Sequence, residues 1–174
     1  MRLRTSLTAL LSATAVAVTL TAATTSPANA AAIPKFKQPK VFGTSFQKDP
    51  RHDFTKRISP RHDGVLRGWI TRHRGGIAEY EPIKWAKGKH TEGRFVGPPE
   101  GDVTRYASPI SKNVTFYSSY GCRGGDGGVT VDSRGVGDKR CSRKEFFSRL
   151  KDRHPALITV YRGKIVKFQE IYVP

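Results

Sequence analysis

The chain contains only two cysteines, Cys122 and Cys141, and they enclose a glycine-rich loop that includes residues 124–128. In an exported protein an isolated pair of cysteines most simply forms one disulfide bond. Closing a loop of about 20 residues stabilises a fold by about 3 kcal/mol in the chain-entropy model. Because the sequence has no C-x-x-C motif, we expect a structural disulfide rather than a redox centre.

Residues 1–30 have the pattern of a secretory signal peptide. Arg2 and Arg4 give it a positive start, residues 7–20 are apolar, and Ala28-Asn29-Ala30 is a small-x-small cleavage signal. The apolar stretch is short and rich in Thr and Ala, so it suits a membrane anchor poorly. We expect a secreted, extracellular and soluble protein without a transmembrane segment.

The charge of the chain indicates an anionic partner. The chain has 31 Lys and Arg residues and 14 Asp and Glu residues. Without Arg2 and Arg4 the formal net charge is +15. Such an excess favours nucleic acid, anionic wall polymers or acidic membrane surfaces, although it also simply promotes solubility. The candidate anion-binding residues are Lys35, Lys37, Lys40, Arg72, Arg74, Lys84, Lys87, Lys139, Arg140, Arg143 and Lys144, and a further basic pair is Lys56 and Arg57.

Residues 31–62 predict a basic, extended arm that is partly disordered, because lysines alternate with prolines and isolated aromatics. Phe36, Phe42 and Phe46 lie among these lysines and suit stacking on single-stranded bases. Alternatively, the three rings pin the arm onto the domain. The arm also contains Pro-Arg-His-Asp twice, at 50–53 and 60–63, which favours polar turns with a capping Asp over a metal site.

Residues 63–174 predict a single β-rich domain. Strand-type runs occur at 65–71, 77–81, 103–106, 113–120, 129–131, 156–161 and 165–173. Glycine turns join the first two runs and the last two runs into hairpins. Ser142-x-x-Glu145 is a capping box that begins a helix, which we expect to end at His154-Pro155. Pro82 and Gly88 predict one helical turn between them.

The expected fold class is therefore mainly β, with one covering helix. Strands that follow one another through short turns favour a small antiparallel barrel or a curled sheet. The mixed polarity of both faces of run 165–173 indicates that this strand lies centrally in the sheet.

Two stretches resemble a group of small secreted actinobacterial proteins of unknown function. One runs from Gly64-Val65-Leu66-Arg67-Gly68-Trp69-Ile70 through Trp85 to Gly88. The other runs from Ile158-Thr159-Val160-Tyr161-Arg162-Gly163-Lys164-Ile165-Val166 to Tyr172-Val173-Pro174. Those proteins likewise have a signal peptide and a closing hairpin that ends in Tyr-x-Pro. The resemblance implies an exported, β-rich domain, and it implies no activity.

The preferred function is non-enzymatic binding of anionic polymers or cell-surface material by a monomer. An alternative is a small secreted nucleic-acid hydrolase of the ribonuclease type, with Glu79 or Glu81 as base and His73, His90 or His154 as acid. Arg72, Arg74 or Arg94 would then hold the phosphate. A second alternative is a toxin or inhibitor that presents the stapled loop to another protein.

Several chemistries have no sequence support. The chain has no G-x-S-x-G esterase motif, no H-E-x-x-H zinc motif and no four-ligand Cys/His set. The Gly124–Gly128 stretch lacks the G-K-[ST] that closes a P-loop. We therefore expect neither a metal nor a cofactor.

Overall fold

A computed structural model describes residues 32–173, except residues 51, 90–91, 103–104 and 123–127. The signal peptide, the candidate acid His90 and part of the expected strand 103–106 therefore lie outside the described residues. Among the described residues, no helix is long and apolar enough to cross a membrane.

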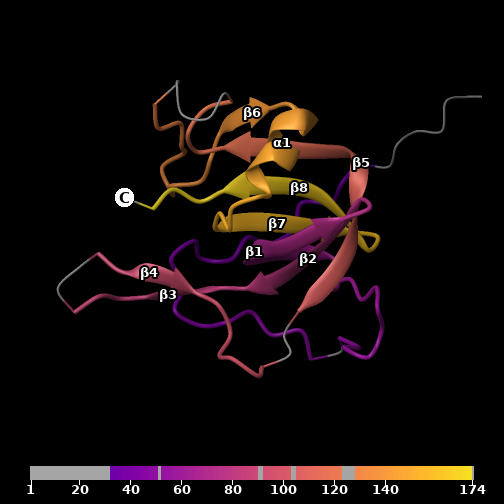
Figure 1. Cartoon of the computed structure of the whole chain (residues 1–174). Coiled ribbons are helices and arrows are strands. Elements are labelled where there is room, and N and C mark those ends of the chain that lie inside the picture. Colours follow the sequence, from indigo (N-terminus) through magenta and orange to yellow (C-terminus); the bar gives the residue numbers. More distant parts are fainter. Residues whose placement is uncertain (1–31, 51, 90–91, 103–104, 123–127, 174) are drawn as a thin grey trace, which may run out of the picture. The chain divides into compact units, whose positions relative to one another are not determined.

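Five strands close into a barrel (Figure 1). Within the described residues, the strands and the single α-helix are β1 (Gly64–Arg74), β2 (Ile77–Pro82), β3 (Lys84–Ala86), β4 (Arg94–Val96), β5 (Tyr106–Ser118), β6 (Lys139–Cys141), α1 (Arg143–Arg149), β7 (Ala156–Tyr161) and β8 (Lys164–Glu170). The main sheet has the order β2-β1-β7-β8-β5-β6, and a further pairing of β2 with β5 closes the barrel. The mainly β fold class with one helix is thus confirmed.

The connectivity of the barrel is that of a Greek key. Counted along the chain, its five strands neighbour one another in the order first, second, third, fifth, fourth, and back to first. The third and fifth strands, β5 and β8, run parallel, and α1 lies in the connection between the third and fourth. This is the connectivity of the five-stranded barrels called OB-folds. Short turns predicted antiparallel neighbours only, so this parallel pair was not expected.

β1 pairs with both of its neighbours in the barrel, and the change of partner falls at Gly68. Its first half pairs with β7 and its second half with β2, and Gly68 has a partner on each side. A Cβ atom at Gly68 would lie 2.4 Å from the carbonyl oxygen of Glu81, so the close approach requires glycine. Gly75 and Gly76 then form the two-residue turn to β2 with φ values of 59° and 77°, as a hairpin of this length needs.

The expected helical turn at residues 82–88 is wrong, because β3 lies there and pairs with β4. The pairing places Trp85 opposite Phe95, with ring centroids 5.0 Å apart. Burial of these rings outweighs the local Pro and Gly signals that suggested a helix. Run 129–131 contributes only an isolated bridge from Val131 to Gly137.

Helix α1 covers one end of the barrel. Ser142 and Glu145 form the capping box that the sequence predicts. Phe146 is fully buried, and its ring lies 5.7 Å from that of Phe116 in β5 and 5.3 Å from that of Phe168 in β8. The helix ends at Arg149, earlier than the expected end at His154-Pro155.

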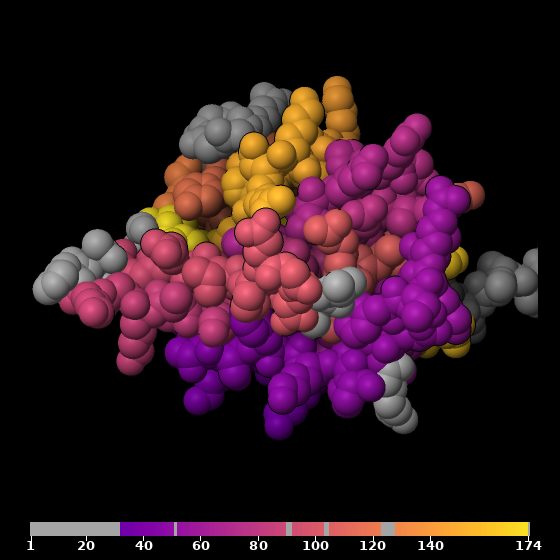
Figure 2. Space-filling model, turned by 60° about the horizontal axis from the view of Figure 1, so that its bottom comes forward, coloured from indigo at the N-terminus to yellow at the C-terminus, as the bar shows by residue number. Residues whose placement is uncertain are grey.

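The arm lies against the domain. Its described part contains neither helix nor strand, and Figure 2 shows the indigo part of the arm beside the pink hairpin of β3 and β4. Arg67 of β1 is only 2% exposed and fastens the arm. Its guanidinium donates hydrogen bonds to the carbonyl oxygens of Lys40, Ser45 and Ile83.

Candidate anion-binding site

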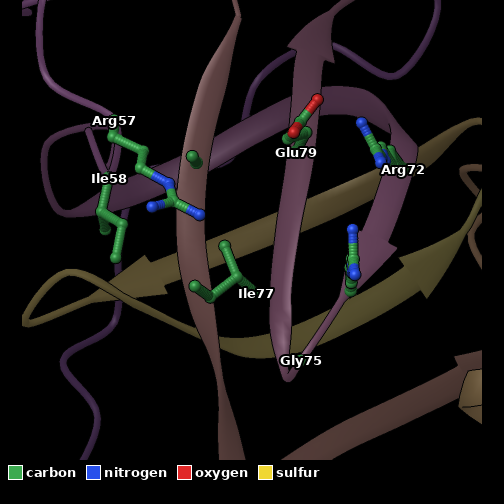
Figure 3. Close-up of a pocket in the computed structure, with 8 residues that line it drawn as sticks. Arg57, Ile58, Arg72, Gly75, Ile77 and Glu79 are labelled. Carbon is green, nitrogen blue, oxygen red and sulfur yellow. The ribbon is translucent and has the colours of Figure 1, made fainter.

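A pocket of about 660 Å³ lies on the outer face of the barrel beside the β1–β2 turn. Its lining consists of Arg57, Ile58, Arg72, Arg74, Gly75, Ile77, Glu79 and Ala107. Figure 3 shows Arg57 approaching from the arm and Arg72 from β1, with Ile77 and Glu79 of β2 between them. Two segments that are separate in the sequence, the arm and β1, therefore supply one cationic surface.

A β-bulge at Thr71 places the two arginines of β1 on this face. Ile70 pairs with Tyr80, and the next partner of β2, Glu79, pairs with Arg72 rather than with Thr71. An extra residue in one strand shifts the side-chain alternation by one position. Arg72 and Arg74 consequently share the outer face with Glu79 and Ile77. With an unbroken alternation, the two arginines would lie on the opposite face of β1, the face that carries Ile70.

The third arginine comes from residues 49–62 of the arm, which we call the strap. The amide of Ala107 in β5 donates to the carbonyl of Ser59 at 3.0 Å, and the amide of Arg61 donates to the hydroxyl of Tyr80 at 3.1 Å. These bonds tie the strap to β2 and β5 near the pocket. This attachment brings Arg57 and Ile58 to the pocket.

The repeated Pro-Arg-His-Asp sequence closes the strap on itself. His62 contacts Asp49 through both its backbone amide, at 3.0 Å, and its ring, at 2.7 Å. The ring of His52 packs against Tyr106 at 4.5 Å, and Asp53 caps the turn at Thr55. Burial raises the pKa of Tyr106 to about 12, so this tyrosine stays protonated. The interpretation of the repeat as polar turns agrees with these contacts.

The pocket carries an excess of unpaired positive charge. Among the described residues, the guanidinium groups of Arg57, Arg72 and Arg74 take part in no ion pair. The one acid of the lining, Glu79, lies 3.5 Å from Arg105. Guanidinium groups bind phosphate, sulfate and carboxylate in a planar, two-bond geometry, so the surface is chemically suited to anions.

The structure separates the residues proposed for hydrolysis. Glu79 lies in the pocket with Arg72 and Arg74, but His73 pairs with the buried Ala78 and therefore projects from the opposite side of the hairpin. Its ring lies 5.9 Å from that of Phe147. Glu81 is already engaged, because it accepts a hydrogen bond of 2.6 Å from the indole of Trp69.

The described ones among the remaining hydrolysis candidates, His154 and Arg94, do not line the pocket that contains Glu79. His154 lies after α1, with its ring 3.8 Å from Asp152. Arg94 belongs to β4, and His90 lies outside the described residues. No histidine occurs in the described lining of the pocket.

The other basic candidates are distributed over separate surfaces. Lys35, Lys37 and Lys40 lie on the arm, and Lys87 follows β3. The ammonium of Lys84 lies 4.9 Å from the ring centroid of Phe46. Lys139 and Arg140 belong to β6, while Arg143 and Lys144 begin α1. None of them lines the pocket. Of the two basic residues at 56 and 57, only Arg57 does.

Sequence reasoning missed the role of Ile58 and the burial of Arg67. The Ser59-Pro60 step before the second Pro-Arg-His-Asp copy was the available signal that the strap turns back toward the barrel. For Arg67 there was none, since a lone arginine in a strand normally points to solvent.

The expected disulfide between Cys122 and Cys141 is present. It joins the start of the glycine-rich loop to β6. Among the described residues, Glu145 and these two cysteines form the only group with metal-ligand spacing, and the bond between the two sulfur atoms occupies their ligand positions.

Comparison with known proteins gave no match: no family model, no curated protein and no solved structure is similar to this chain.

Proposed function

We propose that this protein is a non-enzymatic binding protein for anionic polymers, and that the pocket of Arg57, Arg72 and Arg74 holds the negative groups of the ligand. The observation that carries the proposal is the convergence of three guanidinium groups from the strap and β1, none of which has an ion pair within the described part of the chain. Long cationic side chains placed together without partners repel one another, and a bound anion removes that cost.

The position of the pocket supports the same function. In OB-folds, the face of the second and third strands and the loop between the first two bind oligonucleotides and oligosaccharides. The pocket lies on the equivalent elements, namely the turn at Gly75, β2 and the start of β5. This support is an analogy of fold, and the guanidinium chemistry is the stronger argument.

We also propose that the protein acts as a monomer outside the cytoplasm. The disulfide bond supports export, because such bonds persist in oxidising compartments. The net charge of +17 for the whole chain would keep copies apart and attract polyanions.

Titration against single-stranded DNA, single-stranded RNA and a sulfated polysaccharide over a range of salt tests the proposal. We expect tight binding at low salt, and a double variant Arg72→Ala/Arg74→Ala should lower the salt slope by about two. The matched control is Lys151→Ala/Arg153→Ala, which removes the same charge from exposed residues after α1. Equal effects of the two double variants would refute a specific site.

The same samples separate the alternatives. Cut strands would favour the hydrolase and make Glu79 the first residue to replace. A protein complex that persists at high salt would favour the toxin or inhibitor. A complex held by shape complementarity weakens less with salt than one held by charge.

A further inference from the structure

Three hollows follow residues 33–42 of the arm, and their described lining shares no residue with that of the arginine pocket. Their volumes are about 570, 360 and 420 Å³. The first and second share Pro39, and the second and third share Phe36, Gln38 and Val65. Shared lining residues make them a continuous series along the arm, so this surface suits an extended ligand better than a compact one.

Phe42 is an exposed aromatic platform in this series. It lines the first hollow and remains 40% exposed. Its ring lies 5.8 Å from that of Phe95 with an interplanar angle of 20°, and Trp85 contacts it edge-on at 5.0 Å. Two buried or half-buried rings therefore hold Phe42 in place, while part of its surface can still accept another ring.

Two of the three other phenylalanines of the arm, Phe36 and Phe46, are anchors. Phe36 is half-buried and packs on Tyr161, with ring centroids 6.2 Å apart. Phe46 is half-buried under the ammonium of Lys84. Of Phe36, Phe42 and Phe46, only Phe42 combines support by other rings with wide exposure, so the alternatives of pinning and stacking apply to different members of this set.

Cations lie along the hollows. Lys40 and Arg134 border Phe42, and Lys35 and Lys37 line the following hollows. Arg134 is held by Asp132 at 2.7 Å, which fixes its position but offsets its charge. Lys167 lines the last hollow, and burial together with the field of Arg134 lowers its pKa. A positive track thus accompanies the aromatic platform.

We infer that the anionic polymer is a single-stranded nucleic acid, with its backbone along residues 33–42 of the arm and one base stacked on Phe42. This inference rests on the proposed function and specifies its ligand. Cationic grooves with a stacking ring suit single strands because every unpaired base presents an aromatic face. A sulfated polysaccharide offers no such face, and a duplex keeps its bases stacked inside.

The arm is preorganised for this ligand. The hydrogen bonds from Arg67 to the carbonyls of Lys40 and Ser45, and the one from the amide of Trp85 to the carbonyl of Gly43 at 2.9 Å, fix the backbone around Phe42. Binding therefore does not require ordering of this segment, so less conformational entropy of the protein is lost on binding.

The deciding experiment compares a thymine-bearing DNA oligonucleotide with an abasic oligonucleotide of the same length and phosphate number. We expect the protein to bind the abasic strand about tenfold more weakly, because base stacking is lost while the phosphates remain. Phe42→Leu should weaken binding of the thymine strand by a similar factor and leave binding of the abasic strand and of the polysaccharide unchanged.

Phe54→Leu is the matched control, since Phe54 is also 40% exposed and lies on the strap. It should change the preference for bases little. In a Trp69→Phe background Trp85 is the single tryptophan, so its fluorescence should respond to the thymine strand and not to the abasic strand. This readout needs no variant at Phe42 and remains informative if Phe42→Leu is unstable.

Equal affinity for the thymine and abasic strands, with a silent Trp85, would overturn the inference and leave the anion-binding proposal intact. Binding of no polyanion at low salt would overturn both. Base-dependent binding that Arg72→Ala/Arg74→Ala does not affect would support the arm as the site and refute the role of the arginine pocket.

Discussion

Arg67 and Arg74 belong to the same strand, β1, but their guanidinium groups have opposite surroundings. Arg67 is 2% exposed and donates to three backbone carbonyls, two of them on the arm. Arg74 is exposed beside Arg57 and Arg72 and, among the described residues, has no ion pair. Placement, set by the arm at one end of β1 and by the bulge at Thr71 at the other, makes one arginine structural and the other available to a ligand.

The largest expected effect comes from the buried member of this comparison. Arg67→Ala should lower the free energy of unfolding by about 3–5 kcal/mol, because it leaves buried carbonyl groups without donors and removes packed side-chain atoms. Urea unfolding measures the loss, and limited proteolysis should cut the arm of the variant first.

Arg74→Ala is the matched control on the same strand. Its stability should stay within about 0.5 kcal/mol of that of the unaltered protein, as expected for an exposed side chain that forms no ion pair with any described residue. If the two variants lost equal stability, the distinction between a structural and an available arginine would fail.

A smaller effect is expected from the buried carboxylate of Glu170, which contrasts with the pocket carboxylate of Glu79. Glu170 is 1% exposed, accepts hydrogen bonds from Ser118 and Ser119, and lies 3.7 Å from Arg149 of α1. Glu170→Gln should lower the free energy of unfolding by about 2 kcal/mol, because it removes a buried charge from its partners. Thermal and urea unfolding measure it.

Glu79→Gln supplies the contrast for that variant. Glu79 faces solvent and Arg105, so its substitution should leave stability nearly unchanged and should strengthen anion binding by removing the one negative charge of the pocket lining. A destabilisation by Glu79→Gln as large as that by Glu170→Gln would show that the pocket face is structural.

The sequence was informative where the structure depends on neighbouring residues. The first hairpin, the closing hairpin, the capping box at Ser142 and the disulfide were all predicted from local patterns. Arg72, Arg74 and Glu79 were already candidates because their residue types suit phosphate chemistry. These features need only a short stretch of chain to be recognised.

Other features depend on contacts between distant segments. The parallel pairing of β5 with β8 spans a disulfide loop and a helix, and β3 forms only because β4 returns beside it. The bulge at Thr71 decides which of Arg72 and His73 faces the pocket. A bulge of one residue has no pattern in this sequence by which it could be recognised. The separation of His73 from Glu79 follows from that bulge and could not be predicted.

The smallest expected effect is a dependence of stability on pH. It tests whether the strap and β1 support the pocket in different ways. Burial lowers the pKa of His52, and the nearby carboxylates of Asp49 and Asp53 oppose that effect only in part, while His62 adds to it. The folded strap therefore favours neutral His52, whereas the unfolded chain binds a proton near its ordinary pKa of about 6.5.

Stability should consequently be highest above pH of about 7 and should fall as the pH drops through 6.5 toward the lower pKa of the folded state. The Asp49 carboxyl acts in a separate, more acidic window: burial raises its pKa, but hydrogen bonds from His62 outweigh that effect and lower it. Chemical unfolding at several pH values should show that the free energy of unfolding falls between pH 7 and 5. His52→Phe should reduce this slope, and His73→Asn should not.

Because the strap carries Arg57 while β1 carries Arg72, acidification should also shrink the effect of Arg57→Ala on anion binding but not that of Arg72→Ala. If both arginine variants kept the same effect at pH 5, the strap would not depend on neutral His52, and the two supports of the pocket would be equivalent.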